Sequence, residues 1–144
     1  MTRYLLDVNV LIALIDPAHV RHDRAHTWFA AEGQHAWATC PLTENGVLRI
    51  VGAARYPSSP GTPAAVAELL SIFRTLKGHE FWPDDISLFD TSVVRCNRLL
   101  NSGQVTDTYL LALASDHGGK LATFDRQLVV DAVVYGDKAL HLID

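Results

Sequence analysis

The nonapeptide YLLDVNVLI, residues 4–12, contains an apolar run that ends in an acidic residue, Asp7. This pattern predicts a buried strand over residues 3–8 and a short helix over residues 9–15. An Asp-Pro pair at residues 16–17 ends the helix, because proline cannot continue it. A carboxylate at the end of a buried strand is costly unless another group compensates its charge.

Strands and helices alternate along the rest of the chain. Capping residues, glycines and the spacing of apolar residues set their expected bounds. We predict strands over residues 36–40, 79–82, 120–124 and 140–143, and helices over residues 22–32, 41–51, 63–77, 91–101 and 107–117. The alternation indicates an α/β fold with a parallel sheet covered on both faces. Because no repeat or linker is found, residues 1–144 are expected to form a single domain.

Three more acidic residues lie where solvated carboxylates are uncommon. Asp125 ends the apolar run LATF at residues 121–124. Glu44 and Asp107 lie near the starts of two predicted helices, and each shares its helix face with apolar residues three, four and seven positions later. No matching set of basic residues accompanies the four acids, so we expect a divalent cation to compensate them.

The expected topology brings these acids to one edge of the sheet. Asp7 and Asp125 follow strand ends, and Glu44 lies four residues beyond the end of another strand. Ligands of parallel sheets bind beyond the carboxyl ends of the strands. The helix that Asp107 opens can cross the sheet, at roughly 1.5 Å per residue, and lead into the strand that ends at Asp125. Clustered carboxylates without cysteine or paired histidine suit Mg²⁺ or Mn²⁺ rather than zinc.

Composition sets only broad limits on the function. The net charge of −4 disfavours a protein that grips nucleic acid through a bulk positive field, but not one that carries metal ions. No segment reaches the roughly 18 apolar residues of a membrane span, and the N-terminus lacks the features of a signal peptide. We therefore expect a cytoplasmic protein whose two cysteines, Cys40 and Cys96, are reduced core residues.

Four motifs, in this order, resemble those of the PIN-domain nucleases, and most of all the VapC-type toxins of bacterial toxin–antitoxin pairs. They are LLDVNVLI at residues 5–12, TE at 43–44, VTDTYLLALA at 105–114 and LATFD at 121–125. The resemblance implies a three-layer α/β/α PIN-like domain with a central parallel sheet. It also implies a metal-dependent endoribonuclease that hydrolyses RNA phosphodiester bonds, a small cognate antitoxin protein as partner, and a homodimer.

The resemblance extends to six residues of this sequence. Its acidic positions are Asp7, Glu44, Asp107 and Asp125, and its supporting polar positions are Asn9 and Thr123. We expect the first three acids to hold the main Mg²⁺ or Mn²⁺ ion, and Asp125 to hold a second ion or its water. Asn9 is expected to donate a hydrogen bond to a carboxylate or to the scissile phosphate, and Thr123 to orient Asp125 or a metal-bound water.

Two functions of other classes remain open. Asp7 could be the covalent nucleophile of a metal-binding phosphohydrolase, although a well-placed lysine and a late acidic pair are missing. The acidic pocket could also bind a metal or a partner without catalysis, as a regulatory module, although only one acid stands at the first strand end. Arg49, Arg55 and Arg126 lie near the acidic edge in sequence, and both phosphate contacts and ion pairs are open to them.

Overall fold

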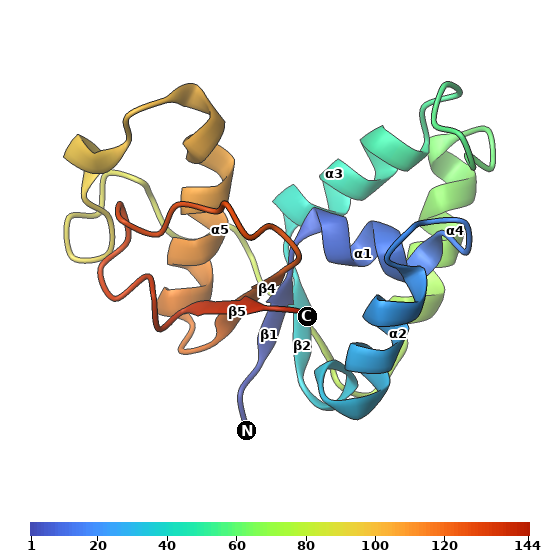
Figure 1. Cartoon of the computed structure of the whole chain (residues 1–144), viewed down its shortest axis with the longest axis horizontal. Helices are drawn as coiled ribbons and strands as arrows, with labels where there is room; N and C mark the ends of the chain where they lie inside the picture. The colour runs from blue at the N-terminus through green and yellow to red at the C-terminus, as the bar shows by residue number, and fades with distance from the viewer.

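The computed structural model of the chain describes residues 1–144 as three layers, with a sheet between two sets of helices (Figure 1). The strands are β1 (Tyr4–Leu6), β2 (Trp37–Thr39), β3 (His79–Phe81), β4 (Lys120–Thr123) and β5 (Leu140–Leu142). They pair in the order β3-β2-β1-β4-β5, and every pair is parallel. The predicted α/β fold with a central parallel sheet is confirmed.

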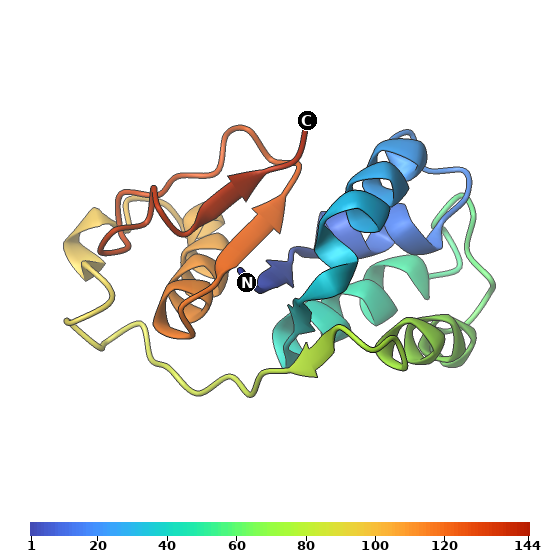
Figure 2. The same cartoon turned by 90° about the horizontal axis from the view of Figure 1, so that it is seen from below.

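Helices cover both faces of this sheet. The α-helices are α1 (Val8–Ile15), α2 (His22–Ala31), α3 (Pro41–Val51), α4 (Pro63–Arg74) and α5 (Val105–Asp116), and short 3-10 helices span Gly33–His35, Cys96–Arg98 and Ser102–Gln104. Figures 1 and 2 show α1 to α4 gathered on one side of the sheet and α5 on the other, with the loops that flank it. No helix is both long enough and apolar enough to cross a membrane.

The central strand β1 contributes to a core on each face, because successive side chains of a strand point in opposite directions. Tyr4 and Leu6 pack in the core beneath α1 to α4, whereas Leu5 packs in the core beneath α5. Both leucines are fully buried. This two-sided burial explains why the sequence of β1 is continuously apolar rather than alternating.

The helix predicted over residues 91–101 does not form. Val94 makes an isolated antiparallel bridge with Val133, and Arg95 N donates to Ala132 O at 2.7 Å. Backbone groups that a helix would have used locally are therefore satisfied by a distant segment. The segment is rich in β-branched and short polar residues, whose weak helix propensity such pairing easily overrides.

The same region corrects two further expectations. Cys96 is exposed, so the prediction that both cysteines are core residues is wrong for Cys96 and right for Cys40. Helix α5 begins at Val105 rather than at residue 107, because the 3-10 turn over Ser102–Gln104 leads directly into it. Asp107 nevertheless remains in the first turn of α5.

The C-terminal end of α1 is fixed by two histidines of α2. His22 Nδ1 donates to the carbonyl of Ala13 at 2.7 Å, and His26 Nε2 donates to the carbonyl of Leu14 at 2.8 Å. Carbonyl groups in the last turn of a helix lack partners within that helix, so these contacts stabilise the end of α1. They also hold α2 against α1.

The opposite end of α1 lies close to α3 because residue 46 is glycine. A Cβ atom at Gly46 would lie only 2.8 Å from Cγ2 of Val8. The two helices begin beside neighbouring strand ends, where Asp7 and Cys40 are their N-cap residues. The small residue therefore sets how closely the start of α1 approaches α3.

We expect Gly46→Val to lower the free energy of unfolding by about 1–3 kcal/mol, because the added methyl groups overpack the contact with Val8. Chemical denaturation measures this change. In a Val8→Ala background the same substitution should cost less, since the clashing methyl groups are gone. Equal costs in the two backgrounds would show that the contact does not control the packing of α1 on α3.

Candidate active site at the carboxyl edge of the sheet

Pairing of β1 with β4 places the ends of these two strands side by side. Leu6 is in register with Ala122, and Asp7 N donates to Ala122 O at 3.0 Å. Asp7 therefore lies next to Thr123, although the two are distant in sequence. This is the carboxyl edge of the sheet, where the sequence predicted a site.

Asp7 is held rigidly at this edge. Its side chain is 7% exposed, Oδ1 accepts from Val8 N at 2.7 Å as the cap of α1, and Oδ2 accepts from Thr123 Oγ1 at 2.8 Å. Burial raises the pKa of Asp7, the two hydrogen bonds lower it, and the nearby Asp125 raises it further. The fixed, desolvated carboxylate has no protein cation as a partner.

Asn9 and Thr123 tie the two strand ends together. Asn9 Nδ2 donates to Thr123 Oγ1 at 3.0 Å, and Asn9 Oδ1 accepts from Phe124 N at 3.2 Å. Thr123 thus orients Asp7 through its hydroxyl hydrogen, and it meets Asp125 only by accepting from that residue's backbone N at 3.1 Å. The amide of Asn9 contacts the threonine rather than a carboxylate.

Asp107 and Asp125 complete a group of three acids with Asp7. Burial raises the pKa of Asp107 to about 6, and the charges of Asp7 and Asp125 raise it too. Asp107 has no ion-pair partner, while Asp125 Oδ1 accepts from Gln127 N at 2.9 Å. The first turn of α5 and the ends of β1 and β4 therefore bring three uncompensated carboxylates together.

Glu44 makes different contacts. Its Oε2 accepts from Thr39 Oγ1 at 2.7 Å and lies 3.1 Å from Arg74 Nε, in a recess between α3 and α4. It makes no direct contact with Asp7, Asp107 or Asp125. The expectation that no basic residue compensates the acids is wrong for Glu44, because α4 supplies Arg74.

A short hydrogen-bond chain fixes Glu44 in this position. Thr39 uses its only hydroxyl hydrogen on Glu44, so His79 Nε2, at 2.8 Å from Thr39 Oγ1, must donate to it. Burial, followed by the charges of Arg74 and Arg3, lowers the pKa of His79 to about 4. The imidazole is neutral near pH 7 and acts as a donor to the threonine.

The three grouped acids fit a hard divalent cation. Asp107 is a half-buried carboxylate without a cation, and every group that the site offers is an oxygen ligand, as Mg²⁺ and Mn²⁺ prefer. No choice of one carboxylate oxygen from each of these acids brings all three oxygens within 4.8 Å of one another. Mg²⁺ usually keeps several waters, which would bridge such a spacing.

A second group of metal-capable side chains lies at the other end of α5. Ligand atoms of Asp85, Asp116 and His117 all lie within 4.8 Å of one another. His117 Nε2 is 3.0 Å from Asp85 Oδ1, and its ring stacks on Trp82 with centroids 4.3 Å apart. No sequence motif indicates this group, because Asp85 lies in an irregular loop. The two acids are exposed, and an ion pair and a stacked ring account for the arrangement.

Comparisons with known proteins identify the family of the chain. The PIN-domain family matches residues 4–132. Ribonuclease VapC44 of Mycobacterium tuberculosis is 44% identical over 131 residues, which cover 91% of this chain and 92% of that relative. The chain belongs to the VapC-type PIN-domain family. Ribonuclease VapC39 of the same species is 44% identical over 128 residues, covering 89% of this chain and 92% of the relative. The resemblance found from the sequence motifs is confirmed.

Solved structures share the fold of this VapC-type chain. VapC20 of M. tuberculosis, a sarcin–ricin-loop-cleaving toxin, aligns with a TM-score of 0.64 at 14% identity and covers 91% of this chain and 96% of its own. VapBC2 of Rickettsia felis, bound to promoter DNA, aligns with a TM-score of 0.62 at 13% identity over 99% of both chains. The predicted three-layer α/β/α architecture is confirmed.

We expect Asp107→Asn to stabilise the metal-free VapC-type domain at about pH 7.5. The pKa of Asp107 is raised, so its ionised form destabilises the fold above about pH 6. The gain should be about 1 kcal/mol once solvent screening of this half-exposed group is considered, and it should disappear as the pH falls from 6 toward 3.8, where the wild-type carboxyl is protonated.

Thermal unfolding in EDTA across this pH range measures the effect. Glu68→Gln, at an exposed position of α4 without an ion pair, is the control and should show no such pH-dependent gain. A stabilisation that is the same at all pH values would contradict the raised pKa of Asp107.

Proposed function

We propose that this VapC-type domain is the endoribonuclease toxin of a type II toxin–antitoxin pair, and that it hydrolyses RNA phosphodiester bonds at the carboxyl edge of the sheet. The observation that carries the proposal is the meeting of Asp7, Asp107 and Asp125, none of which forms an ion pair with a protein cation. Relatives named ribonucleases, at 39–44% identity, support RNA as the substrate. The oxygen-only ligand set supports Mg²⁺ or Mn²⁺ as the cofactor.

Asp7 and Asp107 have different roles in the proposed hydrolysis. A bound Mg²⁺ or Mn²⁺ supplies Lewis-acid polarisation of a phosphoryl oxygen and a lowered pKa for bound water. Asp7, locked by Thr123 and the backbone of Val8, provides a fixed carboxylate in the desolvated floor of the site. Asp107 must lose its proton before it binds a cation, since its pKa is about 6 in the metal-free protein.

Asp125 lies where it can contact water or substrate, and Asn9 supports the strand ends beside it. Asp125 is more exposed than Asp7, and only one of its carboxylate oxygens is engaged by the backbone. The free oxygen can orient an attacking or leaving group at the rim of the site. Asn9 keeps the two strand ends in register, so the carboxylates stay at a constant spacing.

We extend the toxin proposal to the partners that the family resemblance implies. VapC20, which shares the fold, is a toxin, and VapBC2 is a complex seen on promoter DNA. These neighbours support a small antitoxin partner for this chain. The homodimer that the resemblance implies and the cytoplasmic location expected from the sequence belong to the same proposal.

We expect Asp7→Asn to reduce RNA cleavage by at least roughly 100-fold while the protein stays folded, because a neutral amide binds the cation poorly. EDTA should abolish wild-type cleavage, and added Mg²⁺ or Mn²⁺ should restore it. Asp85→Asn, in the other metal-capable group, is the control and should retain wild-type activity. Circular dichroism confirms folding, and a fluorescent RNA reports cleavage.

Other outcomes of this assay identify the alternatives. Wild-type cleavage by Asp7→Asn, or loss of cleavage only in Asp85→Asn, would remove the carboxyl edge as the active site. An aspartyl-phosphate trapped on Asp7 would instead favour the phosphohydrolase. Metal binding without any cleavage of RNA would favour the regulatory module.

The role of Glu44 has its own test. If Glu44 is a metal ligand, as the resemblance implies, Glu44→Gln should weaken Mn²⁺ binding by roughly 10-fold or more. Arg74→Gln should strengthen it, because the carboxylate is released from its ion pair. Calorimetric titration with Mn²⁺ measures both. If Glu44→Gln binds Mn²⁺ with unchanged affinity, the metal site has only three acidic ligands. The role of Glu44 would then be to join α3 to α4 through its ion pair with Arg74.

A further inference from the structure

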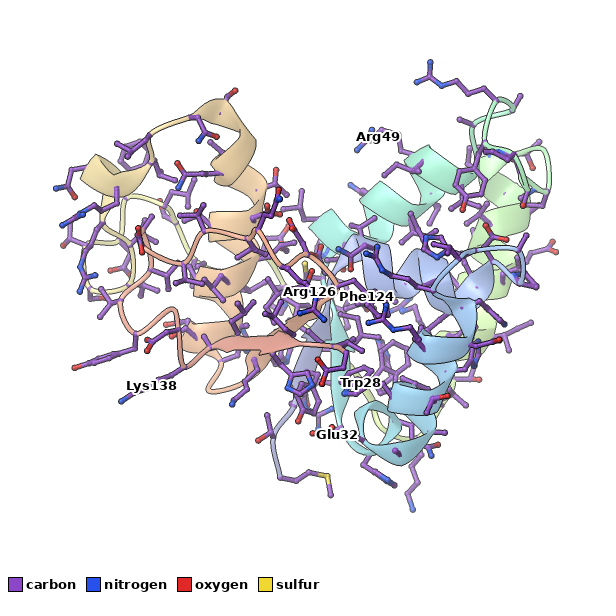
Figure 3. All side chains as sticks on the ribbon, in the orientation of Figure 1. Trp28, Glu32, Arg49, Phe124, Arg126 and Lys138 are labelled. Atoms are coloured by element: carbon purple, nitrogen blue, oxygen red, sulfur yellow. The ribbon has the colours of Figure 1, made fainter.

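Basic and aromatic side chains line a recess beside Asp125. It has a volume of about 430 Å³ and is lined by Asn9, Arg21, Phe124, Asp125, Arg126 and Gln127. Two of these residues, Asn9 and Asp125, also belong to the candidate active site. Figure 3 shows Phe124 and Arg126 together where the α5 side of the molecule meets the α1–α3 side. The recess is therefore continuous with the acidic edge.

Two arginines of this region share one aromatic ring. Arg21 Cζ lies 5.4 Å from the centre of the Phe124 ring, and Arg24 Cζ lies 5.5 Å from it. The ring itself is 3% exposed, so it forms part of the wall against which both guanidinium groups rest. Stacking on an aromatic face orients a guanidinium group without consuming its hydrogen-bond donors.

Neither arginine is explained by an ion pair or by helix stability. The ion pairs of the chain involve Arg3, Arg74, His117 and Arg126, and not Arg21 or Arg24. Arg21 directly precedes α2 and Arg24 lies in its first turn, where the helix dipole disfavours positive charge. Two free cations therefore lie at a place that costs local stability, next to a group of acids. Such a local conflict is typical of a functional site.

We propose that Arg21, which lines this recess, and Arg24, which lines a second recess with His141 and Asp144, bind backbone phosphates of the RNA strand next to the scissile one, and that the strand runs past the Phe124 ring to reach Asp125. The inference rests on the proposed ribonuclease function and names the residues that position its substrate. Guanidinium groups match phosphate oxygens in a forked geometry, which gives orientation as well as charge. Arg126 also lines this recess, but its guanidinium group lies 3.8 Å from Asp144 and is paired with that carboxylate.

The roles of Arg49 and Arg126, which the sequence left open, differ in the structure. Arg126 lines the recess, whereas Figure 3 shows Arg49 on α3, well away from Phe124 and Arg126. Because the chain carries a net charge of −4, a local cluster of cations is what would hold RNA against an otherwise acidic protein. Arg21 and Arg24 were not singled out from the sequence, since their meeting over Phe124 depends on the packing of α2 beside the end of β4.

The test is an Arg21→Gln/Arg24→Gln double variant, with KM and kcat measured for a short single-stranded RNA in Mg²⁺. We expect KM to rise by roughly 10-fold with little change in kcat, because the two arginines would bind beside the reacting phosphate and not at it. Binding of the same RNA in EDTA, followed by fluorescence anisotropy over a salt series, gives a readout without cleavage. In a plot of the logarithm of the binding constant against the logarithm of the salt concentration, the slope should become shallower by about 0.7 for each phosphate that the variant no longer binds.

Two further variants make the test decisive. Arg98→Gln removes an exposed arginine without an ion pair from a separate recess, and it should leave KM and the salt dependence unchanged. Arg21→Lys/Arg24→Lys keeps the charges, and it should retain most of the salt dependence. If the arginines only shield Phe124, the glutamine and lysine variants should lose stability alike and leave KM unchanged.

Different results would overturn the phosphate site and the ribonuclease function. Wild-type protein that cleaves RNA, combined with an unchanged KM and salt dependence in the glutamine variant, would overturn the phosphate site and leave the ribonuclease standing. An equal change in Arg98→Gln would also overturn it, because the effect would then be one of general charge. Wild-type protein that neither cleaves nor binds RNA would overturn both.

Discussion

The hydrogen bond from Thr123 Oγ1 to Asp7 Oδ2 joins two strand ends that are 116 residues apart, and the proposed chemistry depends on it. Asp7 lies beside Thr123 because β1 and β4 pair in parallel. The same carboxylate caps α1, so the sheet, the helix and the site share one buried charge. Burial raises the pKa of this group, and the threonine and the capping amide oppose that rise. A buried anion is stable only where such donors surround it.

Local patterns predicted the sheet and the meeting of three acids at its edge, whereas contacts between distant segments were not predictable. Strands that end in Asp7 and Asp125 are visible as apolar runs followed by an acid, and Asp107 keeps its place in a first turn even though α5 begins earlier than expected. The segment at residues 91–101 fails as a helix because its backbone pairs with residues near Val133. Such pairing is set by tertiary structure, which propensity does not encode.

Glu44 shows how the electrostatic argument changes once the partners are known. From the sequence, four acids lacked basic neighbours, but Arg74 of α4 lies 3.1 Å from Glu44. The need for a cation therefore rests on three carboxylates, and the ion pair of Glu44 also serves to join α3 to α4. A metal that recruited Glu44 would have to compete with Arg74 and break the hydrogen-bond chain through Thr39. The cost of that rearrangement would reduce the net affinity that a fourth carboxylate adds.

The edge of this domain must satisfy two opposed demands, because its carboxylates attract a cation while its proposed substrate is a polyanion. Arginines free to close on Asp125 would neutralise the acids and compete with the metal. Phe124 offers a physical solution, since its buried ring holds the guanidinium groups of Arg21 and Arg24 about 5.4–5.5 Å from its centre, and neither forms an ion pair. Opposite charges can then coexist at one edge because an aromatic wall, one residue before Asp125, keeps them apart.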